Sequence, residues 1–464
     1  MSEWKKVKIG DFLKRKRIPI QLESDKEYKL ITIKLYHKGV YLRGNKKGSE
    51  IHSNMYKVSK GDFILSGIDA RNGAFGIVPD SLDGAIVTND FWYFDIDELI
   101  IKKEFFLWLT STPVFLDACQ KASMGETQRI RLQKDAFFNY QIKCPSIEYQ
   151  DEFLARINPI IEKIKIIQSE TEKQTEYAKL LRQNILQEAI EGKLTADWRK
   201  KNPVQKGNPD YDAEALFEQI QKGEVSPSLQ PASQFSATPS AGSNAARNAR
   251  SKTLAPITDE EKPFEISEGW KWVRLGELGE YYRGSGITRA DIIEKGYPCV
   301  RYGELYTTYD LCFTNTKSFI SKELYTKCKK FCKNSIIFTL TGENRQDIAK
   351  ASAYLGIEPV AASGDLGFWI NHQQNPKYLS FFLASLYFTN KKKRIATGDF
   401  IIHISVEKIK NVLLPLPPLK EQEEIVNKVE TLLAKVTTLE NQIQDRKSLS
   451  DKLIFGIIKE NLEG

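Results

Sequence analysis

Two stretches of the chain, residues 147–194 and 419–462, repeat apolar residues at alternating steps of four and three. In the first stretch these positions are Phe153, Ile157, Ile160, Ile164, Ile167, Thr171, Gln174, Ala178, Leu181 and Ile185. In the second they are Ile425, Val429, Leu432, Val436, Leu439, Ile443, Arg446, Leu449, Leu453 and Ile457. This spacing is that of a coiled-coil seam. We therefore predict two long amphipathic helices.

The two stripes match when the helices run antiparallel. Seam positions whose residue numbers add to about 610 pair apolar side chains, for example Phe153 with Ile457 and Ile185 with Ile425. A helix of about 45 residues is about 68 Å long, which is too long for one small domain to cover. We predict an antiparallel pair, in which Pro159 interrupts the first helix near its start. The alternative is that each helix lies on a domain of its own.

The rest of the chain is duplicated. The segment Trp4–Gly10 is echoed by Trp270–Gly276, and the phrase Pro145–Phe153 that opens the first helix is echoed by Pro417–Ile425. Counterparts lie about 266 to 276 residues apart throughout. Both copies mix strand-like and helix-like stretches, and in the first copy residues 104–119 are predicted to form one helix. A repeat of this length indicates two copies of one scaffold.

We predict an α+β protein, in which two duplicated α/β globules are joined by two long helices packed as an antiparallel coiled coil. Between the halves, residues 224–255 are largely Ser, Ala, Pro, Asn and Gln, a composition that predicts a flexible or disordered segment. The expected domains are residues 1–146 (first globule), 147–198 (central long helix), 199–265 (linker, partly disordered), 266–416 (second globule) and 417–464 (C-terminal long helix).

Composition describes an ordinary globular protein with a modest positive charge. The chain has 464 residues, 41% of them hydrophobic and 28% charged, with a net charge of +8. No apolar run is long enough to cross a membrane, and the start, Met-Ser-Glu-Trp-Lys-Lys, does not resemble a signal peptide. The six cysteines form no CxxC pair, which suits a reducing compartment. We expect a cytoplasmic protein with no membrane partner.

No motif for catalysis is found. A P-loop, a glycine-rich cofactor loop, a nuclease motif and the Asn/Asp-Pro-Pro-aromatic motif of adenine methyltransferases are all missing from the sequence. The four histidines are scattered, and the cysteine spacing matches no zinc pattern. We therefore expect no catalytic residue, no cofactor and no bound metal in this chain.

Basic, aromatic and amide residues instead gather in loops that differ between the two copies. Arginine bonds in a fork to guanine, and asparagine or glutamine to adenine, so such loops suit reading of the DNA major groove. For any single residue, solvated surface charge is the simpler interpretation, whereas the whole set favours recognition. The candidate DNA-binding residues are Lys34, His37, Arg43, Lys46, Lys47, Arg71, Asn72, Gln128, Arg129, Arg131, Arg283, Arg301, Tyr302, Asn344, Arg345, Gln346, Lys392, Arg394 and His403.

The order globule, helix, globule, helix resembles the specificity (S) subunit of type I restriction–modification enzymes. The residues that carry the resemblance are the openings Trp4–Gly10 and Gly269–Gly276, the phrase Pro417–Ile425 with its weaker copy Pro145–Phe153, and the segment Leu186–Trp198. The resemblance implies two target recognition domains, each reading half of a bipartite, asymmetric double-stranded DNA site. It also implies that the helices dock two DNA adenine methyltransferase (M) subunits, with restriction/translocase (R) subunits added in a phage defence complex. Catalysis would then lie in those partners.

Two other functions are compatible with parts of the sequence. A stand-alone DNA-modifying enzyme would need an active site that no motif reveals, and methyl transfer or cleavage by the purified chain would expose it. A coiled-coil scaffold would show no DNA binding, and it would not explain two α/β globules with divergent basic loops.

Overall fold

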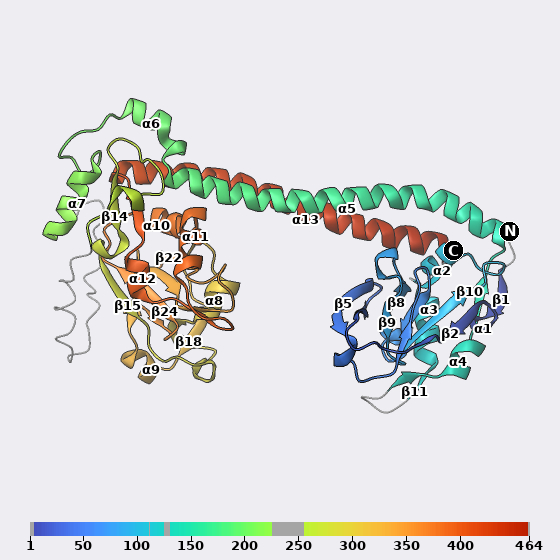
Figure 1. Cartoon of the computed structure of the whole chain (residues 1–464). Coiled ribbons are helices and arrows are strands. Elements are labelled where there is room, and N and C mark those ends of the chain that lie inside the picture. Colours follow the sequence, from blue (N-terminus) through green and yellow to red (C-terminus); the bar gives the residue numbers. More distant parts are fainter. Residues whose placement is uncertain (1–3, 111, 125–129, 225–254, 463–464) are drawn as a thin grey trace. The chain divides into compact units, whose positions relative to one another are not determined.

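The computed structural model of the protein describes residues 4–110, 112–124, 130–224 and 255–462. The chain divides into two compact units, residues 1–173 with 443–464, and residues 174–442. Each unit contains one α/β copy together with a part of each long helix (Figure 1). The predicted fold class, two duplicated α/β copies and two long helices, is confirmed.

The long helices are α5, Ile147–Ile190, and α13, Leu419–Leu462. Helix α5 ends before Gly192, whose φ of +72° is the left-handed conformation that commonly terminates helices. Pro159 lies inside α5, so the predicted interruption there was wrong. A proline removes one intrahelical hydrogen bond, and the turns on both sides still form when packing holds them.

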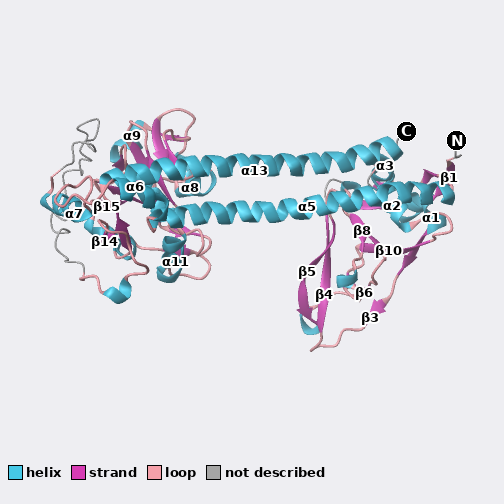
Figure 2. Cartoon of the chain, turned by 90° about the horizontal axis from the view of Figure 1, so that it is seen from above, coloured by secondary structure: helices cyan, strands magenta, loops and turns pink. Residues whose placement is uncertain are grey.

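In each unit the two helices lie side by side and antiparallel (Figure 2). In the first unit Gln168 Nε2 donates to Asp451 Oδ1 (3.1 Å), and in the second Arg182 bonds to Thr437 and Glu440 (3.3 and 3.2 Å). The numbers of these partners add to about 620. The predicted register was therefore wrong by about ten residues, or about 15 Å along the helix. Similar apolar stripes pair at several offsets, whereas the polar side chains beside them fit only one.

Burial along the helices agrees with only part of the predicted seam. Predicted positions that are less than 4% exposed include Phe153, Ile157, Ile164, Ile425, Val429 and Val436. Other predicted positions are 38–67% exposed, and these are Ile160, Ile167, Leu181, Leu439, Leu449 and Leu453. The predicted seam buries Ile160 and Leu432, but the residues that are buried in the structure are their neighbours Ile161 and Leu433. The start of each helix covers its own globule as well as the other helix, which turns the buried face away from a strict seam.

The first copy is built on two sheets. One has the order β2-β10-β7-β8 and the other the order β3-β6-β9-β4-β5, in which β4 and β9 are parallel. The strands of the first sheet are β2 (Leu13–Lys16), β10 (Phe91–Ile96), β7 (Phe63–Ser66) and β8 (Phe75–Ile77). Those of the second are β3 (Pro19–Ile20), β6 (Met55–Lys57), β9 (Ile86–Val87), β4 (Glu27–Lys34) and β5 (Gly39–Lys47).

Short helices cover the first of these sheets. They are α1 (Ile9–Phe12), α2 (Lys103–Thr110), α3 (Pro113–Lys121) and α4 (Lys134–Asn139). The single helix predicted over residues 104–119 is two helices, because Pro113 takes the first position of α3. Buried phenylalanines from the sheet and these helices form the centre of the core, with Phe63 contacting Phe106 and Phe115 edge-on.

The second copy repeats both sheets. The order β15-β24-β20-β22 matches β2-β10-β7-β8, with β17 added at the edge, and the order β19-β23-β16-β18 matches β6-β9-β4-β5. Its strands are β15 (Glu280–Arg283), β16 (Tyr297–Val300), β17 (Cys312–Phe313), β18 (Ser318–Ile320), β19 (Lys330–Phe331), β20 (Ile336–Thr339), β22 (Ala351–Tyr354), β23 (Val360–Ala362) and β24 (Leu366–Ile370). Its helices are α8 (Tyr302–Thr307), α9 (Lys322–Lys327), α10 (Pro376–Ala384), α11 (Leu386–Ile395) and α12 (Val406–Lys410).

Small ribbons and a connector complete the chain. The ribbons are β1 (Lys5–Lys8) with β13 (Gln141–Cys144), β14 (Lys271–Arg274) with β26 (Leu413–Leu416), β11 (Ser123–Met124) with β12 (Arg131–Leu132), and β21 (Thr341–Gly342) with β25 (Ile402–His403). After α5 come α6 (Ala196–Lys201) and α7 (Ala213–Lys222). Most of the segment predicted to be flexible, 224–255, lies outside the described residues. Among the described helices, none is long and apolar enough to span a bilayer.

A glutamine fixes the start of each long helix to its globule. Gln150 is fully buried; its Oε1 accepts from Lys102 N–H (2.7 Å) and its Nε2 donates to Pro145 O (3.0 Å). Its counterpart Gln422 is also fully buried, accepts from a backbone N–H (2.9 Å) and donates to the equivalent proline carbonyl (2.9 Å). The glutamine of the repeated phrase, Gln150 or Gln422, therefore fixes the start of each long helix to its globule, and we call this pair of hydrogen bonds the glutamine lock.

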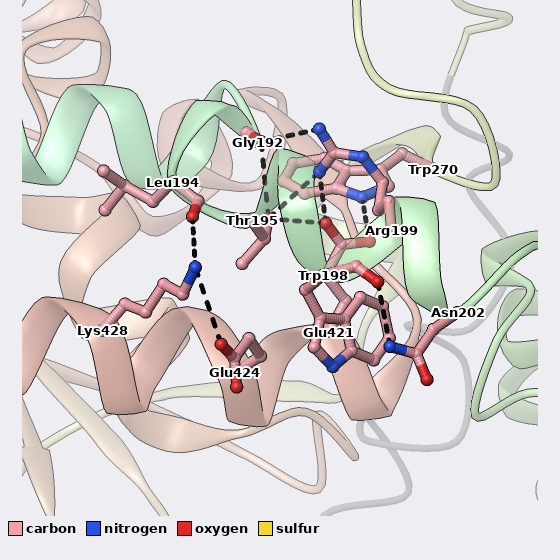
Figure 3. A network of polar contacts seen from close by, with 10 residues as sticks. All are labelled: Gly192, Leu194, Thr195, Trp198, Arg199, Asn202, Trp270, Glu421, Glu424 and Lys428. Atoms are coloured by element: carbon pink, nitrogen blue, oxygen red, sulfur yellow. Dashed lines mark hydrogen bonds and ion pairs between the residues drawn. The ribbon is translucent and has the colours of Figure 1, made fainter.

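The residue before this glutamine differs between the copies. Glu421 is 1% exposed and gathers donors from the connector and from the second globule (Figure 3). Trp270 Nε1 and Thr195 Oγ1 each donate to it at 2.7 Å, and the Arg199 guanidinium forms an ion pair with it. The equivalent Tyr149 makes an edge-on ring contact with Trp4 instead. The network holds the connector after α5 against the start of α13 within the second unit.

Candidate nucleic-acid interface

In the first copy, backbone hydrogen bonds join three loops at the end of β7. Gly67 N–H donates to Asp90 O (2.7 Å), and Leu132 N–H donates to Gly67 O (2.8 Å). The loop after β7 therefore lies between the loop before β10 and strand β12. Because these bonds use only main-chain atoms, they place the side chains of the three loops next to one another whatever those side chains are.

The tip of the β4–β5 hairpin contacts the same region. Tyr36 N–H donates to Asn72 O (2.9 Å) and His37 N–H donates to Gly73 O (3.0 Å). Tyr36 and His37 lie in the loop between β4 and β5 and have φ of 60° and 58°, the left-handed conformation that costs about 1–2 kcal/mol per non-glycine residue. Partial burial lowers the pKa of His37. The tip is held firmly, and Tyr36 remains 72% exposed.

Arg131 lies on β12 and pairs with Asp90. Its Nη1 is 2.8 Å from Asp90 Oδ1, and the two side chains are 59% and 43% exposed. The pair is accessible to a ligand, and solvent screening keeps its own contribution to stability small. Its structural effect is to restrict the direction in which the guanidinium points.

The structure brings together only some of the residues predicted for the first copy. His37, Arg71 and Asn72 meet at the hairpin tip. Arg131 is connected to them because its neighbour Leu132 bonds to Gly67, in the loop that leads to Arg71. The other candidates on the hairpin are Lys34, Arg43, Lys46 and Lys47. Lys34 lies near the tip, 4.3 Å from the Tyr41 ring centroid, whereas Lys46 and Lys47 lie at the far end of β5. Gln128 and Arg129 lie outside the described residues.

The second copy contains the same backbone arrangement. Leu340 N–H donates to Asp365 O (2.8 Å), and Ile404 N–H donates to Leu340 O (3.0 Å). These residues correspond to Gly67, Asp90 and Leu132 of the first copy. The loop that follows α11 is closed by two bonds between the backbones of Thr397 and His403 (2.9 and 2.8 Å). It is the counterpart of the loop between β11 and β12.

Side chains at this place differ from those in the first copy. His403 Nδ1 is 3.3 Å from Thr341 Oγ1, and that hydroxyl donates to Asp365 Oδ1 (3.2 Å). Arg345 donates to the carbonyls of Ala396 and Gly398 (3.3 and 3.2 Å). Arg345, predicted to contact DNA, therefore also holds the loop that carries His403.

Other candidates surround this loop. Asn344 bonds to Asp347 (2.8 Å), and Tyr302, 40% exposed, contacts Tyr306, whose hydroxyl donates to Thr341 O (3.0 Å). Arg283 Nε donates to Gly364 O (2.7 Å), the residue before Asp365. Gln346 and Arg394 are exposed, and Arg301 lies 3.6 Å from Glu304. Arg283, Tyr302, Arg345 and His403 are thus connected around β21 and the loop after α11.

Lys392 is the exception. Its side chain is 5% exposed, and burial lowers its pKa to about 8. A buried ammonium group cannot reach a DNA phosphate without a change of conformation, so Lys392 is not part of the candidate interface.

Sequence reasoning missed four residues that belong to this surface. Three are the polar partners Asp90, Thr341 and Asp365, and the fourth is Phe400, which is 96% exposed at the tip of the loop after α11. The phenylalanine two residues after Gly398 could have been noticed in the sequence. The aspartates gave none, because each lies at least 24 residues along the chain from its partner. Within the described part of the chain, no three metal-ligating side chains lie together.

Comparison with known proteins agrees with this duplicated arrangement. The family described as "Type I restriction modification DNA specificity domain" matches residues 1–177 and 267–446. The specificity subunit of the type I restriction enzyme EcoAI from Escherichia coli is 26% identical over 209 residues, 43% of this chain and 34% of that subunit. That of EcoDI, also from Escherichia coli, is 20% identical over 392 residues, 80% of this chain and 71% of that subunit.

A solved structure shares the fold along the whole chain. It comes from work on complex assembly and conformational transition of the type I R-M system. The TM-score is 0.62 at 16% sequence identity, with 99% of this chain and 97% of that chain covered. The matched family regions include both α/β copies and most of both long helices. The chain belongs to the type I restriction–modification DNA specificity family, and it carries the family's domain twice.

Proposed function

We propose that this chain is the specificity subunit of a type I restriction–modification complex and that each α/β copy reads half of a bipartite, asymmetric DNA target. The proposed reading domains are residues 1–146 and 266–416, carried by the helical segments 147–198 and 417–464, with 199–265 as the linker. One observation carries the proposal. The two copies share a main-chain arrangement at the end of β7 and β20, and they place different polar side chains on it.

The proposed DNA surface follows from that arrangement. In the first copy it comprises the hairpin tip, the loop after β7 and β12, with Arg71, Asn72 and Arg131 as its polar groups. In the second it comprises the loops around α8, β21 and β25, with Arg345 and His403. Arginine, histidine and amide groups suit the edges of bases and the phosphates beside them. Two different surfaces account for an asymmetric target.

The proposed partners are two DNA adenine methyltransferase subunits, to which restriction and translocation subunits are added, and the complex would act on cytoplasmic DNA. Catalysis is assigned to those partners. Apolar side chains on the outer face of α5 support docking, since Ile166 in the first unit and Tyr177 and Leu180 in the second are 46–65% exposed. Exposed apolar residues grouped on a helix commonly mark a protein–protein contact.

Reconstitution with the methyltransferase partner tests this function. The complex is expected to methylate adenines within one split sequence, and the partner alone is expected to lack that selectivity. Exchanging residues 1–146 for the matching domain of another family member should change one half of the target only. Methylation at unrelated sites, or a change in both halves after the exchange, would contradict the proposal.

A further inference from the structure

We propose that Arg131 and His403 occupy equivalent base-contacting positions in the two copies and read bases of opposite hydrogen-bonding character. Arg131 donates to guanine, whereas His403 accepts from the exocyclic amino group of adenine or cytosine. The inference rests on the proposed function, because it names the bases that the same surface contacts.

The equivalence of the two positions follows from backbone contacts. Arg131 precedes Leu132, which donates to Gly67 O, and His403 precedes Ile404, which donates to Leu340 O (2.8 and 3.0 Å). Each residue also pairs across its loop, Arg131 with Met124 and His403 with Thr397. Both side chains therefore start from the same point of the shared sheet arrangement and are exposed.

An aspartate at matching places orients both side chains. Asp90 and Asp365 each accept, through their backbone oxygens, the bond that fixes the loop after the central strand (2.7 and 2.8 Å). Their carboxylates then differ in reach. Asp90 contacts Arg131 directly at 2.8 Å, while Asp365 contacts His403 through the Thr341 hydroxyl. The first copy has Ile68 where the second copy has Thr341. Ile68 has no polar group, and none is needed because the longer Arg131 side chain reaches Asp90 directly.

In the first copy, the ion pair with Asp90 leaves one edge of the Arg131 guanidinium able to donate hydrogen bonds. A guanidinium has five N–H donors, and the contact with Asp90 engages one nitrogen, Nη1. The donors that remain on Nε and Nη2 form the fork that matches guanine O6 and N7 in the major groove. Because the carboxylate restrains the guanidinium, that fork is oriented before DNA arrives.

In the second copy, the directions of the two hydrogen bonds made by the Thr341 hydroxyl leave one nitrogen of His403 as an acceptor. An ionised carboxylate only accepts, so the single hydroxyl proton of Thr341 points to Asp365. The hydroxyl oxygen must then accept from His403, which places the imidazole proton on Nδ1. In the neutral ring Nε2 is left with its lone pair on the exposed side. That atom accepts from adenine N6 or cytosine N4, and it cannot donate to guanine O6.

The test uses the complete complex with its methyltransferase partner, whose target is first mapped with the unaltered chain. Arg131→Ala and Asp90→Asn should relax the same single base pair in one half-site, which contains guanine in the unaltered target. His403→Ala and Thr341→Val should relax one position in the other half-site. The expected loss of discrimination is about 5-fold to 150-fold. Thr341→Ser keeps the hydroxyl and should keep the discrimination, which separates the relay from a general effect of substitution.

A transplant provides the sharper test. The double variant Thr341→Ile, His403→Arg rebuilds the first copy's arrangement, with arginine within reach of Asp365. It should change the preferred base at that one position to guanine and leave the other half-site unchanged. An unchanged preference, or an equal loss of methylation at all sequences, would overturn the inference while leaving the proposed function intact. An unaltered complex without any defined target would instead overturn the proposed function.

Discussion

The two junctions between globule and long helix use the same lock with a different neighbour. At both, a fully buried glutamine accepts from one backbone N–H and donates to a proline carbonyl. The preceding residue is Tyr149 at the first junction and Glu421 at the second, and each contacts the tryptophan that opens its copy. Duplication has therefore kept the part that fixes the helix and changed the part that receives the connector.

The difference shows what a buried carboxylate can do that a tyrosine cannot. Glu421 accepts from Trp270 and Thr195 and pairs with Arg199, so it ties the second globule and the connector to the start of α13. Lys428, about two helical turns further along α13, adds a bond to Leu194 O (2.9 Å). Among the described residues at the two junctions, the connector contacts the second junction, and the buried carboxylate lies there.

Removing the carboxylate is the strongest way to break this comparison. Glu421→Ala should lower the free energy of unfolding of the second unit by about 3 kcal/mol, because it leaves Arg199 and the Trp270 N–H without their acceptor. Urea denaturation combined with hydrogen exchange resolves which unit opens. The matched change at the first junction, Tyr149→Ala, removes one ring contact and should cost about 1 kcal/mol. Equal losses at the two junctions would show that the network adds nothing.

Lys392 offers a second asymmetry. Counted from the matching N-caps Ser385 and Thr112, its counterpart in the first copy is Cys119, which is also buried but carries no charge. Burial lowers the pKa of Lys392 from 10.5 to about 8, so the charged form is penalised in the folded state. Lys392→Met should raise the free energy of unfolding by up to about 3 kcal/mol at pH 7, since one pKa unit corresponds to about 1.4 kcal/mol.

The sign of the pH dependence follows from the same shift. Below about pH 8 the lysine is charged in both states and the full penalty applies, whereas above pH 10.5 it is neutral in both and the penalty vanishes. The advantage of the methionine variant should therefore shrink as pH rises from 8 to 10.5. Denaturant unfolding of both proteins across this range measures it, and a constant difference would mean that burial does not penalise the charge.

The shared lock predicts equal effects. Gln150→Ala and Gln422→Ala should each lower the free energy of unfolding by about 1–3 kcal/mol, because each leaves a buried backbone N–H without an acceptor. Hydrogen exchange at Lys102 N–H and Asn375 N–H reports the loss directly. A large effect at one junction alone would show that the two locks are not equivalent.

The sequence predicts the repeated features of the chain, but it says little about which side chains contact one another. The duplication, both long helices and the repeated Gln phrase were visible because they recur at a fixed offset. The helix register was wrong because apolar stripes do not distinguish offsets, while Arg182 and Gln168, which do, lie outside the stripe. Local propensity predicts a break at Pro159, because propensity does not include the packing that lets helix α5 continue through this residue.

The candidate surface was found only in outline. Residue type alone predicts Arg131, His403 and Arg345, but it does not reveal that Arg131 and His403 are equivalent. That correspondence depends on the backbone bonds from Gly67 and Leu340, which no residue type announces. The run of basic residues at 391–394 predicts that Lys392 contacts DNA, but helix α11 turns this side chain inward. Charge in a sequence does not say which side of a helix faces solvent.

The two opening tryptophans have a consequence for inheritance. A globule that moved from the first place in the gene to the second would arrive with Trp4 where Trp270 stood, and so with the indole N–H that Glu421 requires. The glutamine and the carboxylate belong to the helix and would stay behind. Recombination at the repeated phrases Pro145–Phe153 and Pro417–Ile425 would therefore exchange whole globules, with their proposed DNA surfaces, without disturbing either junction. A small number of globules could in this way generate many ordered pairs.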